Sequence, residues 1–193
     1  MFESGTKRPG AMAAILGLSE ANVEAACARA REVGEVVPAN YNTPEQLVIS
    51  GEVAAVERAM VLAKELGAKR AIRLNVSGAF HSPLMEDAAA GLKGALDSAP
   101  TAATHFPVYS NVSTHPSAGS AGAKDLLLRQ LTSAVRWTEL VRHMAEDVPE
   151  ALYVEMGPGA VLSTLVKRIV PGARTMTCGT AADVDQLIGV LPA

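Results

Sequence analysis

The sequence predicts an α/β protein in two parts, and two patterns along the chain support this. Over residues 11–77, segments with the character of strands and helices follow one another in the order β-α-β-β-α-β, which is the ferredoxin-like pattern. Over residues 78–193, helical segments alternate with short apolar strands, which is typical of a parallel sheet. Residues 1–10 combine Gly, Pro and charged residues without an apolar period, so they form a lead-in segment.

In the ferredoxin-like subdomain, capping residues and glycines mark where the predicted helices and strands begin and end. Ser19 is placed as the N-cap of a first helix that ends at Gly34, and a second periodic run begins at Val53 and ends at Gly67. Gly51 is expected to break the strand before it. The apolar face of the first helix consists of Val23, Ala26, Cys27 and Ala30. The predicted strands cover residues 12–18, 36–37, 46–50 and 70–76, with a turn over residues 40–44.

The remainder is expected to alternate helices with strands. Helices are predicted over residues 83–97, 124–131, 137–145, 161–169 and 183–190, strands over residues 106–109, 151–155 and 174–177, and a loop over residues 116–122. Buried parallel strands need cover on both faces, and so few strands do not complete such a sheet. We therefore predict that residues 78–193 are the C-terminal part of a larger α/β domain.

The two parts join at a histidine. His81 stands directly before a well-marked helix start, in which Ser82 can act as N-cap and Pro83 as the first helical residue. A loop histidine fixed by a rigid helix start can serve as an acid or a base. The alternative is a solvated loop histidine without a chemical role.

The composition of the chain excludes several classes of protein. The chain has 193 residues, 49% of them apolar, so a globular core is expected rather than disorder. A net charge of −3 argues against nucleic acid as the main partner. No segment is long enough to span a membrane, and we expect a cytoplasmic protein. Neither the cysteines nor the remaining histidines have metal-ligand spacing; these are Cys27, Cys178, His105, His115 and His143.

Several motifs together resemble one enzyme family. They occupy residues 8–14, 40–44, 46–51, 78–85, 129–131, 135–137 and 155–162, in that family's order and over almost the whole chain. The chain resembles the malonyl-CoA:acyl-carrier-protein transacylases of fatty acid biosynthesis. The resemblance implies an α/β-hydrolase-like acyltransferase domain with an inserted ferredoxin-like subdomain. This fold agrees with the two patterns found along the chain.

The resemblance also implies a mechanism and its residues. A serine attacks the malonyl thioester of coenzyme A, a histidine takes its proton, and the malonyl group passes to the phosphopantetheine thiol of acyl carrier protein. By position His81 is the base, and the backbone carbonyl of Gln130 orients it. Phe80 would separate malonyl from methyl-branched substrates, although ordinary packing explains it equally well. Asn42 and Gln46 could border the substrate cleft, although turn chemistry also accounts for Asn42.

Further expectations concern partners. The partners implied are malonyl-CoA and acyl carrier protein, with no metal, cofactor, nucleic acid or membrane, and a monomer when complete. Lys167 and Arg168 could contact an acidic carrier, with a solvated helix end as the simpler explanation. Residues 157–159, Gly-Pro-Gly, could meet an anion at a helix N-terminus, with a tight turn as the favoured explanation.

The sequence lacks three features of the family. The Gly-x-Ser-x-Gly nucleophile segment, the glutamine segment of the oxyanion hole and the arginine that binds the malonyl carboxylate are not found. We therefore expect a C-terminal portion that is inactive by itself. Ser19 lies in Gly-Leu-Ser-Glu-Ala, which helix capping explains, and Ser120 lies in a Gly-rich loop.

Three alternatives remain open from the sequence. The ferredoxin-like subdomain could be a binding module without catalysis. The chain could be a distinct hydrolase that uses Ser19. It could also be the acyltransferase domain of a polyketide synthase.

Overall fold

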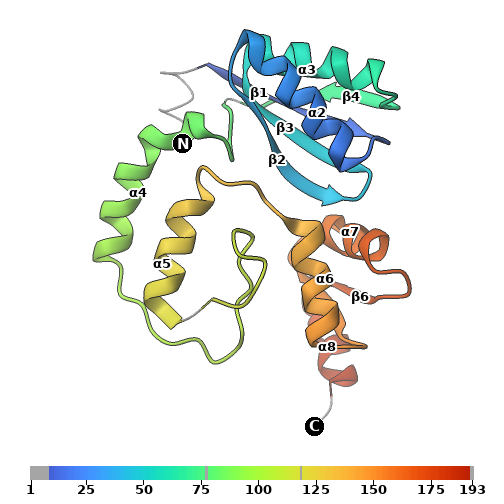
Figure 1. Ribbon diagram of the computed structural model, residues 1–193. Helices are drawn as coiled ribbons and strands as arrows, with labels where there is room; N and C mark the ends of the chain where they lie inside the picture. Colours follow the sequence, from blue (N-terminus) through green and yellow to red (C-terminus); the bar gives the residue numbers. More distant parts are fainter. Residues whose placement is uncertain (1–8, 77, 118, 192–193) are drawn as a thin grey trace. The chain divides into compact units, whose positions relative to one another are not determined.

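The computed structural model describes residues 9–76, 78–117 and 119–191, which form two compact units (Figure 1). The first unit ends at Leu140 and the second begins at Val141. The predicted domain boundary between residues 77 and 78 stays a prediction. Most of the lead-in, residues 1–8, lies outside the described residues, and so does the side chain of Ser120.

The first unit is built on a four-stranded antiparallel sheet with the strand order β2-β3-β1-β4. Helices α2 and α3 lie together on one face of this sheet (Figure 1). The elements follow one another in the predicted β-α-β-β-α-β order. Their bounds are β1 (Gly10–Leu16), α2 (Glu20–Ala30), the 3-10 turn η1 (Arg31–Val33), β2 (Val36–Thr43), β3 (Gln46–Glu52), α3 (Val53–Glu65) and β4 (Arg70–Arg73).

Small apolar side chains bring the two helices close to the sheet. In β1 and β3, the side chains of Ile15, Leu47 and Ile49 point to the helical face and are buried. The predicted apolar face of α2 is confirmed, since Val23, Ala26, Cys27 and Ala30 are all buried. Each large side chain buried in this way contributes roughly 1.5–3 kcal/mol to folding. With few aromatic residues, this alanine-rich contact supplies the core of the unit.

The opposite face of the sheet carries a second, smaller apolar cluster. Met12, Ala39 and Val48 are buried there, and Ala14, Leu74 and Phe80 pack against them. Because side chains alternate along a strand, Met12 of β1 and Val48 of β3 face away from the helices. This cluster connects the sheet to the segment that carries His81.

Two predictions about β2 and β3 are wrong. Residues 40–43 continue strand β2 instead of forming a turn, because register shifts at Pro38/Asn40 and Tyr41/Thr43 let this polar stretch stay paired. Gly51 remains inside β3: a Cβ there would lie 2.1 Å from the carbonyl oxygen of Glu35. The glycine therefore permits a close approach of backbones instead of ending the strand.

The first unit continues with helices and a long loop. After β4 come the 3-10 turn η2 (Pro83–Met85), α4 (Glu86–Ser98), α5 (Gly119–Gln130) and the start of α6 (Trp137–Asp147). The predicted strand over residues 106–109 is absent among the described residues, where Tyr109 only bridges to Pro116. Phe106 is 79% exposed, so the apolar run has no neighbouring strand to bury it. Helix α5 begins at Gly119, inside the predicted loop over residues 116–122.

The second unit contains a parallel strand pair. Strands β5 (Leu152–Met156) and β6 (Arg174–Cys178) pair in parallel, with α7 (Val161–Ile169) between them and α8 (Ala181–Val190) after them. The prediction of parallel strands in this region is thereby confirmed for residues 151–155 and 174–177. Helix α7 buries Leu165, Val166 and Ile169, which is the predicted apolar stripe. The α/β fold class predicted from the sequence is confirmed.

Candidate active site

His81 stands on a tight turn between the sheet and the α4 segment. The preceding residues Gly78 and Ala79 are buried, and Leu84 and Met85 after it are buried as well. His81 itself has a φ of 56° and is half-buried. A residue with a Cβ loses roughly 1–2 kcal/mol in this left-handed conformation, so the surroundings must hold it there.

The imidazole of His81 faces a backbone carbonyl. Its Nδ1 lies 3.2 Å from the carbonyl oxygen of Gln130. Gln130 is the last residue of α5, and the last carbonyls of a helix have no partner inside the helix. The carbonyl is therefore available to the ring, as the resemblance implies for these two residues.

This contact decides which ring nitrogen is available for chemistry. A carbonyl oxygen can only accept a hydrogen bond, so the proton of the neutral ring must sit on Nδ1. The lone pair then resides on Nε2, which can accept a proton from an alcohol or thiol. The arrangement supports a general base without a carboxylate partner.

The segment after α5 is tied to the sheet. The side-chain amide of Gln130 donates to the carbonyl oxygens of Ser133 (3.0 Å) and Ala134 (3.4 Å). Val135 then bonds the edge of β2: its N–H donates to Ala39 and its carbonyl accepts from Tyr41, at 2.8 and 2.9 Å. The carbonyl that faces His81 is thus held by hydrogen bonds that lead back to the sheet.

Phe80 packs against the sheet face opposite the helices. It is half-buried against the cluster of Met12, Ala39 and Val48. This packing agrees with the simpler sequence interpretation, and the role in substrate choice stays a prediction.

Asn42 lies near the end of β2, and Gln46 is the first residue of β3. Both are half-buried, and Gln46 pairs with Thr43 across the hairpin. In the described part of the chain, no hydrogen bond joins either side chain to His81. The structure places them in the same unit as the histidine, and their contact with a substrate stays a prediction.

The other candidate nucleophiles have structural explanations. Ser19 occupies the N-cap position of α2, although its side chain makes no capping hydrogen bond there. It follows β1, an antiparallel strand paired on both sides, whereas a nucleophile elbow follows a parallel strand. Cys27 is buried in the core, and burial raises the pKa of its thiol to about 12. Cys178 is buried as well.

A glutamate explains the Gly-Pro-Gly turn of residues 157–159. Glu155 accepts hydrogen bonds from the N–H groups of Leu162 (3.0 Å) and Ser163 (2.8 Å) at the start of α7. A carboxylate of the chain itself therefore occupies this helix N-terminus, which supports the turn interpretation over an external anion. The backbone N–H of Ser163 and then that of Leu162 hold the pKa of Glu155 below its usual range.

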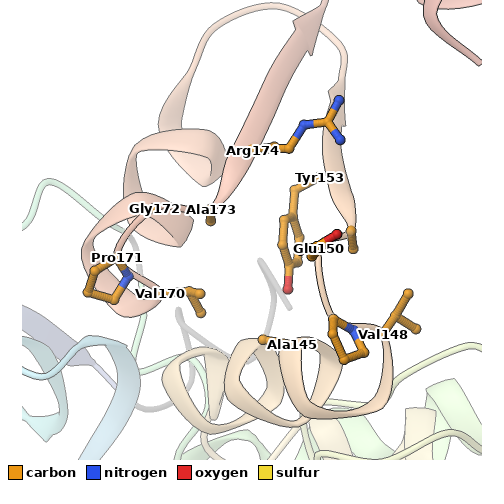
Figure 2. A pocket seen from close by; sticks show the side chains of 11 residues that line it. Ala145, Val148, Glu150, Tyr153, Val170, Pro171, Gly172, Ala173 and Arg174 are labelled. Carbon is orange, nitrogen blue, oxygen red and sulfur yellow. The ribbon is translucent and has the colours of Figure 1, made fainter.

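The second unit also contains a cavity of about 560 Å³. In Figure 2 the ring of Tyr153 points toward Ala145 of α6, and Val170 and Pro171 lie across the cavity from this ring. The Tyr153 hydroxyl is buried without a hydrogen-bond partner in the described structure, and burial raises the pKa of this phenol. None of the site residues predicted from the sequence lines this cavity, so it does not belong to the candidate active site.

Residues 9–76, 78–117 and 119–191 contain neither a metal-binding cluster nor a helix that could span a membrane. No group of three or more His, Cys, Asp or Glu side chains there could hold a metal ion. Within the same ranges, no helix has the length and apolar character needed to cross a membrane.

The sequence interpretation missed residues that act by hydrogen bonding. Arg136 donates to the carbonyl of Val112 and pairs with Glu139, and Thr138 donates to the carbonyl of Tyr41 at 2.9 Å. These contacts fix the start of α6 to a loop and to β2. Only the helical period of this segment was visible in the sequence, because such partners lie far away along the chain.

Comparisons with known proteins identify the family of the chain. The acyl transferase domain family matches residues 3–185. The malonyl CoA-acyl carrier protein transacylase of Escherichia coli is 44% identical over 170 residues, which are 88% of this chain and 55% of that protein. An acyl carrier protein S-malonyltransferase structure from Vibrio cholerae O1 has a TM-score of 0.88 at 44% identity, over 92% of this chain and 58% of that one.

A third relative was solved as a complex. It is a malonyl-transacylase bound to its type II PKS acyl-carrier protein, with a TM-score of 0.88 and 38% identity, over 93% of this chain and 58% of that chain. This chain therefore spans somewhat more than half the length of the relatives it matches. On the extent of the family match and on these identities, the chain belongs to the acyl transferase domain family.

Proposed function

We propose that this chain supplies the histidine base and part of the cleft of a malonyl-CoA:acyl-carrier-protein transacylase in fatty acid biosynthesis. The single observation that carries the proposal is the 3.2 Å contact between Nδ1 of His81 and the carbonyl oxygen of Gln130, in a chain of this family. It leaves Nε2 of the neutral ring as the proton acceptor.

The proposed reaction has two halves. In the first, a serine oxygen attacks the malonyl thioester carbonyl, Nε2 of His81 takes the serine proton, and the C–S bond breaks. The coenzyme A thiolate receives that proton. In the second, the phosphopantetheine thiol of acyl carrier protein gives its proton to His81, and its sulfur attacks the carbonyl of the malonyl-serine ester. The ester C–O bond breaks as the new C–S bond forms, and the serine oxygen takes the proton back from His81. We assign the nucleophile to no residue of this chain, and the reaction as proposed needs no bound metal or cofactor.

Three further residues belong to the proposed cleft. Phe80, beside the base, would place a bulky ring next to the α-carbon of the acyl group and disfavour a methyl branch there. Asn42, near the end of β2, and Gln46, at the start of β3, are half-buried and would border the cleft on the sheet side. The packing of Phe80 against the sheet supports its part, because a ring held in this way cannot move aside freely.

The isolated polypeptide provides a first test. Because we assign no nucleophile to it, residues 1–193 incubated with labelled malonyl-CoA should form no malonyl-serine. A stable serine adduct, located by mass spectrometry, would overturn this part of the proposal.

The base is tested in a chimera. The chain is joined to the amino-terminal portion of the Escherichia coli relative, and malonyl transfer to holo-acyl carrier protein is measured. His81→Ala should reduce kcat by roughly 10²–10⁴-fold, which is the usual contribution of a positioned base. His105→Ala, at an exposed loop histidine, is the matched control and should leave the rate unchanged. Equal rates in both variants would refute the role of His81.

The pathway has one alternative with support. The PKS complex resembles this chain as closely in TM-score as the Vibrio cholerae structure does. A polyketide carrier would then be the acceptor. Competition between fatty acid and polyketide carrier proteins for the malonylated chimera separates the two pathways.

A further inference from the structure

We propose that Ser82 is a positioning residue for His81, because its hydroxyl closes the turn that holds the imidazole on the Gln130 carbonyl. Ser82 matters for catalysis only if His81 is the base, as the proposed function assumes. Its test, however, observes the imidazole ring of this chain directly and needs no catalytic activity.

The hydroxyl of Ser82 bridges both sides of the histidine. It donates to the carbonyl oxygen of Ala79 at 2.6 Å and accepts from the N–H of Leu84 at 3.3 Å. Ser82 is fully buried, so water cannot replace these two partners without opening the turn. Phe80 and His81 lie between the two bridged positions.

The bridge goes beyond helix capping. The bond from Leu84 satisfies the first free N–H of the η2 turn, as any N-cap serine does. The bond to Ala79 instead reaches backward, across His81, to a residue outside the turn of helix. A cap alone would leave the backbone of His81 unconstrained on that side.

The conformation of His81 explains why such a bridge is needed. Its φ of 56° lies in the left-handed region, which a residue with a Cβ leaves readily when nothing opposes it. Relaxation of that angle would swing the ring away from Gln130. The Ser82 hydroxyl opposes this relaxation, because it fixes the distance between the residues on either side.

The far end of the bridge is itself anchored to the sheet. Ala79 is buried against the start of β1, where a Cβ at Gly10 would lie 2.5 Å from the Cβ of Ala79. The absence of a side chain at Gly10 thus lets the turn sit directly on the strand. On the other side, Leu84 and Met85 are buried. The Ala79 carbonyl is therefore a fixed point to which Ser82 ties the histidine.

The tautomer of His81 is the readout that separates positioning from stability. With Nδ1 held on a carbonyl, the neutral ring carries its proton on Nδ1 and none on Nε2. A ring released from the carbonyl exchanges between both tautomers. Nitrogen-15 spectra of the histidine rings, recorded on the whole chain at a pH where the ring is neutral, distinguish a fixed tautomer from an averaged one.

The expected nitrogen signals of His81 differ among the unchanged chain and three variants. The unchanged chain shows one protonated Nδ1 and one bare Nε2 for His81. Ser82→Ala loses this fixed pattern, and its two nitrogen shifts converge. Ser82→Thr, which keeps the hydroxyl, retains the pattern. Thr180→Ala removes the hydroxyl that caps α8, bonded to the N–H of Asp183 at 3.3 Å, and lowers the melting temperature without moving the His81 signals.

Two outcomes would count against the inference, and they differ from one another. If Ser82→Ala melts earlier and still shows the fixed tautomer, Ser82 is a structural cap only. If the unchanged chain already shows averaged tautomers, the Gln130 contact and with it the base of the proposed function are wrong. Ser82→Cys keeps the side-chain volume with a much weaker hydrogen-bonding group, and it decides the question if Ser82→Ala fails to fold.

Discussion

At the scale of single residues, burial is expected to make both cysteine thiols of the chain unreactive. Cys27 has a raised pKa of about 12, caused first by desolvation in the core, and Cys178 is also buried. A thiol reacts as its thiolate, which is scarce for Cys27 at pH 8. The native protein should therefore react with a disulfide reagent such as DTNB only slowly at both cysteines, and fully once guanidinium has unfolded it. Rapid modification before unfolding would contradict the buried placement.

The phenol of Tyr153 gives a second prediction at this scale. Its hydroxyl is buried without a partner in the described structure, and an unsatisfied buried group costs about 1–3 kcal/mol. Tyr153→Phe should leave the free energy of unfolding in urea unchanged or raise it by about 1 kcal/mol. Tyr41→Phe is the matched control: that hydroxyl donates to Glu24 at 3.0 Å, so its removal should lower stability by about 1 kcal/mol. Equal losses in both variants would show that Tyr153 has a partner.

The site shows how far sequence alone reaches for individual residues. The sequence of residues 76–85 was enough to single out His81, because a histidine before a marked helix start is a visible pattern. The Gln130 carbonyl came only from family resemblance, since a backbone oxygen has no side-chain signature. The bond from Ser82 to Ala79 could not be read at all, because it depends on the left-handed φ of His81.

At the scale of elements, helix α7 depends on a carboxylate and therefore on pH. The backbone N–H groups of Ser163 and Leu162 hold the pKa of Glu155 below its unfolded value. A carboxyl with a depressed folded-state pKa stabilises the fold above its unfolded pKa, and this contribution is lost as the pH falls through the folded pKa. We expect Glu155→Gln to lower the melting temperature at pH 7 and to flatten its fall in acid.

The matched control for this prediction is Glu146→Gln, at an exposed position of α6. Its melting curve should follow that of the unchanged chain across the acid range. If Glu155→Gln shows the same pH profile as the unchanged chain, the carboxylate does not stabilise the α7 start.

Elements with a strong internal period were predictable, and those that depend on a distant partner were not. The buried stripes of α2 and α7 follow from helical spacing alone. The strand at residues 40–43 was missed because its polar residues gain their place from pairing with β3. Residues 106–109 have the composition of a strand, but no strand lies beside them in the described structure. The prediction of a strand there was wrong because composition does not show whether a pairing partner is present.

At the scale of the whole molecule, hydrogen-bond protection should differ between the two units. In the first unit, β1 is paired on both sides, and β1 and β3 both contribute to the large core beneath α2 and α3. In the second unit, β5 and β6 pair only with each other within the described chain, and the residues of β5 are at most half-buried. Backbone amides exchange through local opening, whose free energy rises with burial and with the number of paired neighbours.

We therefore expect amide hydrogen exchange to be slowest in β1 and β3 and much faster in β5 and β6. Mass spectrometry of peptic fragments covering residues 10–16, 46–52, 152–156 and 174–178 measures this difference, with the edge strand β4 as an internal reference for single-sided pairing. Exchange in β5 and β6 as slow as in β1 would mean that other chain segments cover this parallel pair, and uniform exchange throughout would mean that the two units open together.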